Sequence, residues 1–153
     1  MTDRIFAEHA PMCWDVGVVA ISSTPDTKRH AFKNWTSYKT NMPSTERKEG
    51  WLKKYDDHGV GVLTGTEIVP GFQLVAIDID DDNLVRATRG FIGDIPSAKR
   101  GKKGETIFGV VPKPDKIKST VHRGKNGVGN IEILIGGKFT IIPPTILMDT
   151  DEP

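Results

Sequence analysis

The sequence predicts an α+β fold in which a mixed or antiparallel sheet carries acidic side chains, helices lie behind the sheet, and a smaller N-terminal α/β subdomain packs alongside. The clearest signal is residues 74–80, LVAIDID, where an apolar start leads into alternating isoleucine and aspartate. That alternation is the period of a strand with one buried and one exposed face. Two further observations are the short apolar runs bounded by glycine and proline, and the helix-spaced aromatic residues of the N-terminal half.

The chain has 153 residues, enough for one domain with a substantial core and too few for two, so we expect a single domain over residues 1–153. The formal net charge is +1, so overall charge does not argue for nucleic acid, although basic residues cluster between Lys99 and Lys125. Cys13 is the single cysteine, which excludes a disulfide framework and fits a reducing, cytoplasmic compartment. No apolar run approaches the roughly 20 residues of a membrane span, so we expect no membrane partner.

The N-terminal half contains predicted strands and helices in alternation. Residues 16–21 have the pattern of a buried strand, and aromatic residues at i, i+3, i+6 spacing within residues 30–41 indicate a short helix. Ser44 is the predicted N-cap of a second helix with an aromatic packing side. Residues 58–65 form a glycine-bounded strand, and the turn after them predicts a β-hairpin with residues 74–80.

The C-terminal half alternates predicted strands with basic, glycine-containing connections. Residues 82–90 are a predicted helix that ends at Gly90. The glycine pair 136–137 is a strong hairpin signal between the last two strands. The strands are expected at residues 106–111, 131–135 and 138–142, and the connections at residues 97–105 and 121–130.

Asp78 and Asp80 point the same way from the predicted strand, about 7 Å apart along it. Two carboxylates side by side on a rigid strand repel each other, and a divalent cation removes that repulsion. Mg²⁺ in particular binds through one or two carboxylates together with substrate phosphates. A plainer interpretation stays open for this acidic run, in which the strand ends at Ile79 and Asp80, Asp81 and Asp82 form a solvated turn or the start of a helix.

Glu132 lies between two isoleucines of another predicted strand, so it faces away from the core as the two aspartates do. If the two strands are neighbours, three carboxylates project from one sheet face and can hold one or two metal ions for phosphoryl or nucleotidyl transfer. Taken alone, Glu132 is better explained as a solvated residue on a half-exposed sheet.

Residues 99–106, KRGKKGET, combine glycines, which let a backbone approach an anion, with cationic side chains. The segment lacks the GxxxxGK[ST] spacing of a Walker A loop, and a mobile solvated turn explains it at least as well. The stretch around Arg123 and Lys125 is equally ambiguous. The histidines show no metal-ligand spacing, and Cys13 has no basic partner that would make it a nucleophile.

The order of these pieces resembles the bifunctional DNA primase/polymerase domain (Prim-Pol) of the archaeo-eukaryotic primase superfamily, which is found in many phages and plasmids. The likeness covers nearly the whole chain. The family's hhhDhD motif is similar to residues 75–80, its GVxTG strand to residues 61–65, and its late acidic strand to residues 131–133. A glycine pair and a strand ending in Pro-Pro-Thr then follow, as they do here at residues 136–137 and 141–145.

The resemblance implies a primase-polymerase-like, RRM-like sheet and a nucleotidyltransferase that acts as a DNA primase or DNA-directed polymerase. Asp78, Asp80 and Glu132 would be the catalytic residues and the ligands of Mg²⁺ or Mn²⁺, which bridge the triphosphate of the incoming nucleotide. The family's middle motif has a histidine that contacts nucleotide phosphates, and this sequence has Thr106 there. That departure puts nucleotide specificity in question.

Nucleotide binding is therefore assigned to other residue types. Lys102 or Lys103 would supply the missing positive charge, and Thr106 would supply a hydroxyl donor. Gly65, which ends the GVxTG-like strand, is expected in the same nucleotide site.

The implied partners are a single-stranded DNA template, nucleoside triphosphates and a helicase domain or protein, in a phage, plasmid or bacterial replication context. The chain would then be the N-terminal part of a longer primase-helicase. Two alternatives stay open. One is a catalytically weak nucleic-acid or nucleotide-binding module of the same fold, and the other is a metal-dependent nuclease or phosphohydrolase that uses the same acids on water.

Overall fold

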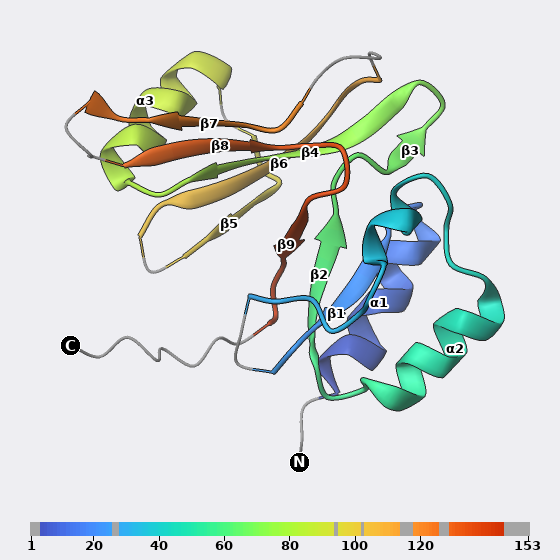
Figure 1. Ribbon diagram of the computed structural model, residues 1–153. Helices are drawn as coiled ribbons and strands as arrows, with labels where there is room; N and C mark the ends of the chain where they lie inside the picture. The colour runs from blue at the N-terminus through green and yellow to red at the C-terminus, as the bar shows by residue number, and fades with distance from the viewer. Residues whose placement is uncertain are drawn as a thin grey trace.

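The computed structural model describes residues 4–25, 28–93, 95–101, 103–113, 118–125 and 129–145, and their strands form two sheets (Figure 1). The three-stranded sheet consists, in spatial order, of β1 (Ala20–Ser23), β2 (Gly59–Leu63) and β9 (Phe139–Ile141). The six-stranded sheet consists of β5 (Ala98–Arg100), β6 (Glu105–Pro112), β4 (Phe72–Ile79), β8 (Asn130–Leu134) and β7 (Thr120–Arg123), with β3 (Glu67–Val69) paired to β4. Every strand pair among the described residues is antiparallel.

The helices within the described residues are α1 (Ile5–Asp15), the 3-10 helix η1 (Trp35–Lys39), α2 (Thr45–Lys54) and α3 (Asp82–Ile92). The predicted α+β class with an antiparallel sheet is thus confirmed. Ser44 caps α2 as predicted, because its hydroxyl accepts a hydrogen bond from the backbone N–H of Arg47 at 3.3 Å. The short helix predicted within residues 30–41 is η1.

α3 ends later than predicted. Gly90 lies inside the helix, and Gly93, with φ of 80°, ends it by donating its backbone N–H to the Arg89 carbonyl at 2.9 Å. A positive φ at a helix end favours glycine, whereas a glycine within an exposed helix costs only about 1 kcal/mol. The helix therefore passes through the first glycine and stops at the second.

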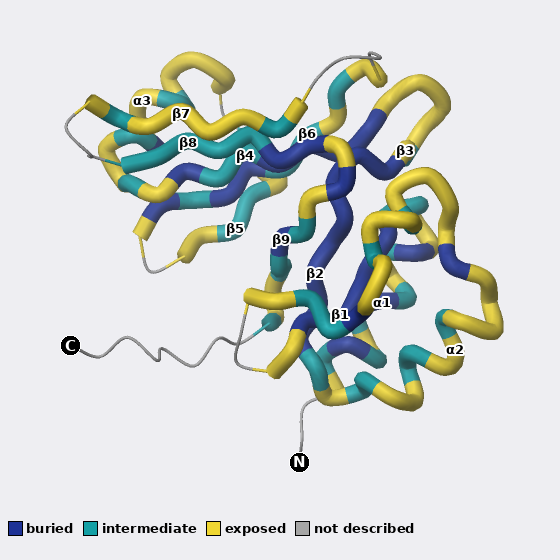
Figure 2. Tube along the Cα trace, in the orientation of Figure 1, coloured by how far each residue is buried: buried dark blue, intermediate teal, exposed yellow. Residues whose placement is uncertain are grey.

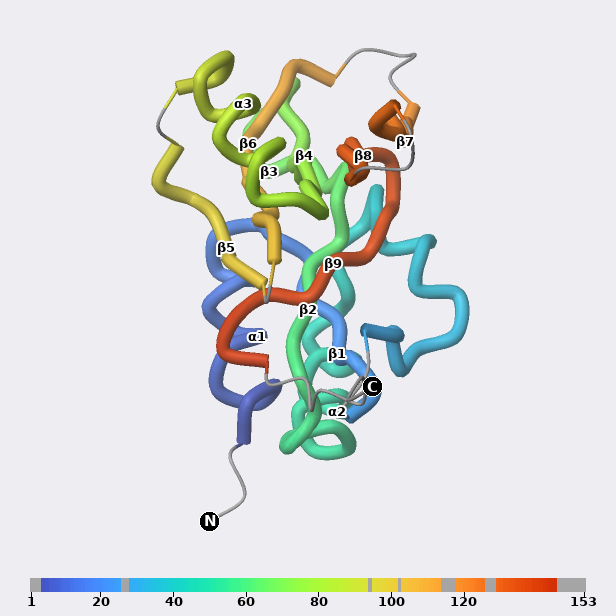
Figure 3. The backbone as a smooth tube through the Cα atoms, turned by 90° about the vertical axis from the view of Figure 1, so that its left-hand side faces the viewer, coloured from blue at the N-terminus to red at the C-terminus, as the bar shows by residue number. Residues whose placement is uncertain are grey.

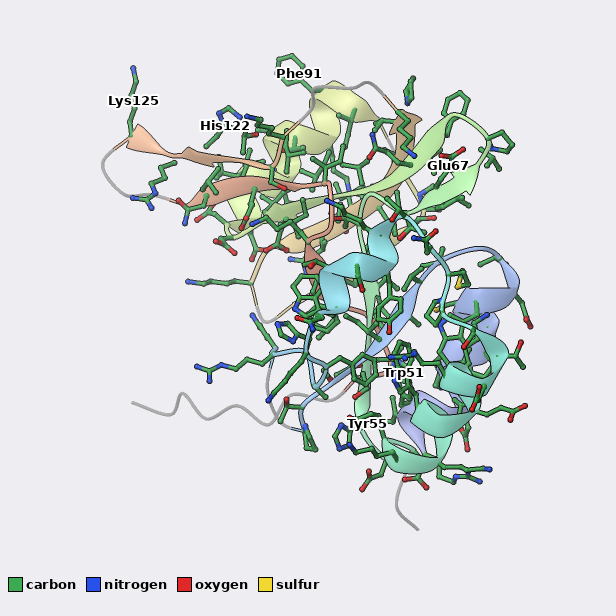
Figure 4. The ribbon with its side chains drawn as sticks, turned by 45° about the vertical axis from the view of Figure 1, so that its right-hand side comes forward. Trp51, Tyr55, Glu67, Phe91, His122 and Lys125 are labelled. Carbon is green, nitrogen blue, oxygen red and sulfur yellow. The ribbon has the colours of Figure 1, made fainter. Side chains whose placement is uncertain are left out.

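An aromatic core joins α1 and α2 to the three-stranded sheet. Phe32 stacks on Trp51 with ring centroids 4.1 Å apart, and Phe6 meets Trp14 edge-on at 6.1 Å. Trp14 donates its indole N–H to the carbonyl oxygen of Ala20 at 3.1 Å, which satisfies its buried polar atom. Figure 4 shows Trp51 on the side of α2 that is turned toward this core.

A second core lies between α3 and one face of the six-stranded sheet. Its buried members are Ile79, Val85 and Ile107. Since side chains alternate along a strand, Ile77 and Ile79 face α3 while Asp78 faces the opposite side. We expected several helices behind this sheet. In the described part of the chain α3 takes that place (Figure 3), and α1 and α2 pack with the three-stranded sheet instead.

The hairpins predicted between β2 and β4 and between β8 and β9 are both wrong, because each connection crosses from one sheet to the other. The crossings run side by side: the Gly137 N–H donates to the Thr64 carbonyl and the Thr64 N–H donates to the Lys138 carbonyl, both at 2.8 Å. A Cβ on Gly65 would lie 2.7 Å from the backbone nitrogen of Gly136. The glycines allow two backbones to approach closely here. Figure 2 shows that the chain is buried along β2 and along the middle of β4.

The sequence does not predict the edge strands: β5 falls inside the first basic connection, and β7 overlaps the start of the second. β7 is exposed along its whole length, so it has no alternation of buried and exposed residues to detect. Charged edge strands are common because they discourage pairing with another chain. β3 likewise occupies a segment predicted as a turn.

Ile79 is 1% exposed beneath the acidic face, so Ile79→Ala should lower the free energy of unfolding by about 2–5 kcal/mol. Phe91 is the matched control, because it is 92% exposed and projects away from α3 in Figure 4. Phe91→Ala should change the same free energy by less than about 0.5 kcal/mol. Urea unfolding followed by circular dichroism measures both, and equal losses would contradict the assignment of this core.

Candidate active-site cleft

A row of polar side chains crosses four neighbouring strands on the face opposite α3. The register pairs Asp78 of β4 with Thr106 of β6 on one side and with Glu132 of β8 on the other. Thr106 is paired in turn with Lys99 of β5. Directly paired residues point to the same face, with Cβ atoms about 4.5–5.5 Å apart. Lysine, threonine, aspartate and glutamate therefore stand side by side across the sheet.

This row forms one wall of a cleft of about 640 Å³. The other wall is β9 with the residues that follow it, which belong to the three-stranded sheet. The acids among the residues that line the cleft are Asp78, Asp80, Glu132 and Glu105, whose carboxylate binds Arg89 of α3, and the cations are Lys28, Lys99, Arg100, Lys103 and Lys138. The cleft thus holds both signs of charge, which suits a cation and an anion bound together.

Asp78 is oriented by its neighbour across the strand pair. Thr106 donates its hydroxyl hydrogen to Asp78 Oδ1, and Thr106 itself is 4% exposed. A carboxylate that accepts one hydrogen bond keeps further lone pairs for another partner. The Thr106 hydroxyl is therefore engaged within the protein, while Asp78 retains the capacity to bind a ligand.

Asp80 follows directly after the end of β4. Its backbone N–H donates to the Asn130 carbonyl at 3.0 Å, and the Asn130 side-chain amide donates to Asp80 Oδ2 at 3.4 Å. These bonds extend the pairing of β4 with β8 past Ile79, so the alternation of faces places Asp80 with Asp78. Asp80 is exposed and lines the cleft.

Asp81 and Asp82 have local structural roles, as the plainer interpretation of the acidic run predicts. The Asp81 carboxylate caps α3 by accepting a hydrogen bond from the Asn83 N–H at 2.8 Å. Asp82 Oδ1 accepts hydrogen bonds from Arg100 Nη2 and from the Gly104 N–H, both at 3.0 Å. Asp82 thus ties the loop before β6 to the start of α3.

Two glycines fix the end of β4. Gly104, with φ of 77°, lies against Ile79, where an added Cβ would overlap the carbonyl oxygen. Gly129, with φ of 64°, lies on the other side, where an added Cβ would be 2.8 Å from Asp81 Cβ. Both backbone conformations favour glycine. The loops before β6 and β8 can therefore close on the strand end that carries Asp80.

The other predicted nucleotide-binding residues lie in different places. Lys103 is exposed and lines the cleft. Lys102 lies outside the described residues. Gly65 lies at the crossing between the sheets, against Gly136, and not among the described residues that line the cleft. Its role in nucleotide binding stays a prediction.

A two-point ion pair fastens α3 to the start of β6. Arg89 donates from Nε and Nη2 to the two carboxylate oxygens of Glu105 at 2.9 and 2.8 Å, and from Nη1 to the Ile95 carbonyl at 3.0 Å. The hydrogen bonds from Arg89 hold the pKa of Glu105 below its usual range, because they favour the charged carboxylate. Glu105 directly precedes Thr106, so the bridge also steadies the row of polar side chains across the sheet.

Lys99 falls in the basic segment 99–106, but sequence reasoning does not assign it to the nucleotide site. Burial lowers the pKa of its ammonium to about 8, opposed by attraction to Asp78 and reinforced by repulsion from Lys28. Lys99 Nζ donates to Thr140 Oγ1 at 3.1 Å and to the Ile141 carbonyl oxygen. The sequence shows a lysine in a basic segment, but β9, a strand of the other sheet, is what covers it.

Cys13 is half-buried, and burial raises the pKa of its thiol. A raised thiol pKa disfavours the thiolate that a cysteine nucleophile requires.

The three predicted metal ligands share one cleft wall without forming a closed cage. No group of three acidic, histidine or cysteine side chains in the described part of the chain is arranged to hold a metal ion. Asp78 and Glu132 are direct cross-strand neighbours whose carboxylates can reach one ion, and Asp80 lies further along. Mg²⁺ keeps several waters and binds through one or two carboxylates plus substrate phosphates. The donor set therefore fits a hard cation that completes its coordination with substrate oxygens.

A family match covers nearly the whole chain. Residues 7–152 match the Prim-Pol family, described as bifunctional DNA primase/polymerase, N-terminal. The chain belongs to the Prim-Pol family. No curated protein matches it. Family membership confirms the predicted resemblance and indicates nucleotidyl transfer of the DNA primase/polymerase type, in a family that generally depends on divalent metal ions.

In this Prim-Pol domain, the position expected to hold a histidine is directly beside Asp78, and Thr106 occupies it. None of the described helices combines the length and apolar character needed to cross a bilayer.

Gly104→Ala should destabilise the Prim-Pol domain by more than about 1 kcal/mol, because the new Cβ meets Ile79 at a left-handed φ. Gly101→Ala in the same loop is the matched control. There the nearest atom to an added Cβ is the Lys103 carbonyl oxygen at 3.4 Å, so the change should be within about 0.5 kcal/mol. Differential scanning calorimetry compares the two, and a tolerated Gly104→Ala would show that the loop does not close on β4.

Proposed function

We propose that this Prim-Pol domain carries out template-dependent nucleotidyl transfer, as a DNA primase or DNA polymerase, with Asp78, Asp80 and Glu132 as its catalytic carboxylates. The observation that supports this proposal most directly is the register that sets Asp78 beside both Thr106 and Glu132 on the open face of the sheet. Carboxylates on one wall and lysines around the same cleft suit a divalent cation and a triphosphate together.

In this proposal Asp78 and Glu132 would hold Mg²⁺ or Mn²⁺, and Asp80 would contribute to a second ion of a two-metal site. Such ions, when bound, stabilise the charge on the transferred phosphoryl group and activate the attacking 3′-hydroxyl. The domain's own residues supply the positioning. Thr106 orients the Asp78 carboxylate through its hydrogen bond, and the Asn130 amide orients that of Asp80.

Cationic side chains around the cleft would receive the triphosphate. Lys103 lines the cleft, and Lys102 precedes it in the chain. Thr106, whose hydroxyl is engaged with Asp78, would act on the nucleotide through that carboxylate.

The template would lie along the edge of the sheet next to the acids. Val121 of β7 pairs with Glu132, so β7 lies next to the row of polar side chains that contains the proposed catalytic acids. β7 and its flanks are exposed and carry Lys118, Arg123 and Lys125, and Figure 4 shows Lys125 projecting from the end of β7. Cationic side chains of this kind bind the phosphates of single-stranded DNA. A helicase domain or protein would supply the unwound strand.

Template-dependent incorporation of a labelled dNTP, with Mg²⁺ or Mn²⁺, tests the proposal. Asp78→Asn and Glu132→Gln should each reduce incorporation by at least about 100-fold, because each removes an anionic ligand of the metal ion that would stabilise the charge on the reacting phosphate. Glu49→Gln removes a carboxylate from α2, outside the cleft, and should keep full activity. Template binding, followed by fluorescence anisotropy, should survive in all three variants. Undiminished incorporation by Asp78→Asn would contradict the proposal.

Two observations favour a second function, a nucleotide- or nucleic-acid-binding module that keeps the fold with little catalysis. The described acids do not form a ready metal cage, and Thr106 occupies the expected histidine position. Such a module binds template and dNTP but neither adds nor removes nucleotides. Binding by the wild type without any change in product length separates it from both a polymerase and a nuclease.

The double variant Lys102→Ala/Lys103→Ala should weaken nucleotide binding about 10-fold, since a hydrogen bond to a charged group contributes roughly 1.5–3 kcal/mol and less at an exposed site. Lys53→Ala/Lys54→Ala on α2 removes the same charge elsewhere and should leave the affinity unchanged. Isothermal titration with a non-hydrolysable nucleotide measures both. Wild-type affinity in the first variant would exclude these two lysines from the nucleotide site.

A further inference from the structure

Lys99 is a half-buried cation that makes no ion pair with any described carboxylate. Its hydrogen bonds go to two neutral oxygens of β9, Thr140 Oγ1 and the Ile141 carbonyl. Asp78 attracts Lys99, but its Oδ1 accepts the hydrogen bond of Thr106. The positive charge of Lys99 is therefore solvated by the protein and attracted by Asp78 without a direct ion pair to any described carboxylate.

A partly desolvated ammonium of this kind is costly for the fold. Taking an unpaired charge out of water is unfavourable, and replacing a buried charge by an apolar side chain of similar volume is often neutral or stabilising. A methionine at position 99 would fill a similar space without this desolvation cost. Stability therefore does not explain the lysine, whereas a ligand that supplies the missing negative charge does.

The surroundings of Lys99 point to an anion as that ligand. Lys28 is close enough for charge repulsion to lower the pKa of Lys99, and both residues line the cleft together with Lys138. An ammonium has three N–H donors, and the bonds to β9 use two of them. The third donor of Lys99 and the charge of Lys28 are available to an anion in the cleft.

We infer that Lys99, together with Lys28, contacts the polyphosphate of the nucleotide in this Prim-Pol domain, in place of the histidine that Thr106 replaces. The inference rests on the proposed function for the identity of the ligand, a nucleoside triphosphate. The position of the anion site is argued only from the residues that line the cleft. Because Lys99 belongs to the six-stranded sheet and its hydrogen-bond partners to the three-stranded sheet, a bound polyphosphate also stabilises the contact between the sheets.

Sodium tripolyphosphate, which lacks a base and a sugar, is the probe. Binding is measured by isothermal titration and by thermal unfolding, in EDTA and in parallel with Mg²⁺. The probe should raise the Tm of the wild type, because a ligand that binds only the folded state stabilises it. Lys99→Met should bind the probe at least about 10-fold more weakly in each buffer that supports wild-type binding, equivalent to a loss of about 1.4 kcal/mol.

Lys53→Met makes the same charge change on α2, outside the cleft, and should bind the probe as the wild type does. Without the probe, Lys99→Met should have the same Tm as the wild type or a higher one. If the Tm of Lys99→Met were several degrees below that of the wild type, Lys99 would stabilise the contact between the sheets, and the inference would be overturned. Lys28→Met, at an exposed position, tests the same site without changing the half-buried Lys99 and should also weaken binding.

Equal affinity of the wild type and Lys99→Met for the probe, or no binding by the wild type in either buffer, also overturns the inference. Nucleotide incorporation separates this failure from that of the proposed function. Lys99-dependent binding without incorporation leaves the anion site standing and removes the polymerase assignment. If the wild type incorporates nucleotide but Lys99→Met binds the probe as well as the wild type does, the polymerase assignment stands and the anion site at Lys99 is removed.

Discussion

The register of β4 with its two neighbours, β6 and β8, is the constraint on which the cleft depends. Because side chains alternate along a strand, a slip of one residue would move Thr106 or Glu132 to the face covered by α3 and bring an apolar residue to the cleft. The covered face opposes such a slip, since Ile79 and Ile107 are buried against α3. Apolar packing on one face of the sheet therefore determines which polar side chains meet on the other.

The end of β4 is held by backbone contacts and by the two acids that do not enter the cleft. Gly104 and Gly129 let the flanking loops close on the strand, Asp81 caps α3, and Asp82 binds the Gly104 N–H. The acidic run thus divides by role. Its first members line the cleft, and its last members build the support that keeps Asp80 in place.

The cleft has two walls because the chain crosses twice between its sheets. The crossings are joined by the hydrogen bonds between Thr64 and the segment around Gly137. They bring β9 against the acidic face of the six-stranded sheet, where Lys99 reaches across to Thr140. A ligand that spans the cleft from the acids to β9 therefore touches both sheets, so its binding and the packing of the sheets are linked.

Local patterns along the chain were enough to predict the acidic strand at residues 74–80, the start of α2 at Ser44 and membership of the Prim-Pol family. The alternation of a strand, the cap of a helix and the order of motifs can all be found from residues that are close in the sequence. The same signals predicted the wrong neighbours for two pairs of strands, β2 with β4 and β8 with β9. The glycines at 136–137 indicated a hairpin, yet in the structure they allow a close backbone crossing. Glycine permits both conformations. The burial of Lys99 could not be predicted either, since it depends on β9, which lies about forty residues later in the chain. Strand neighbours and buried charges follow from packing between distant segments, which a local pattern does not contain.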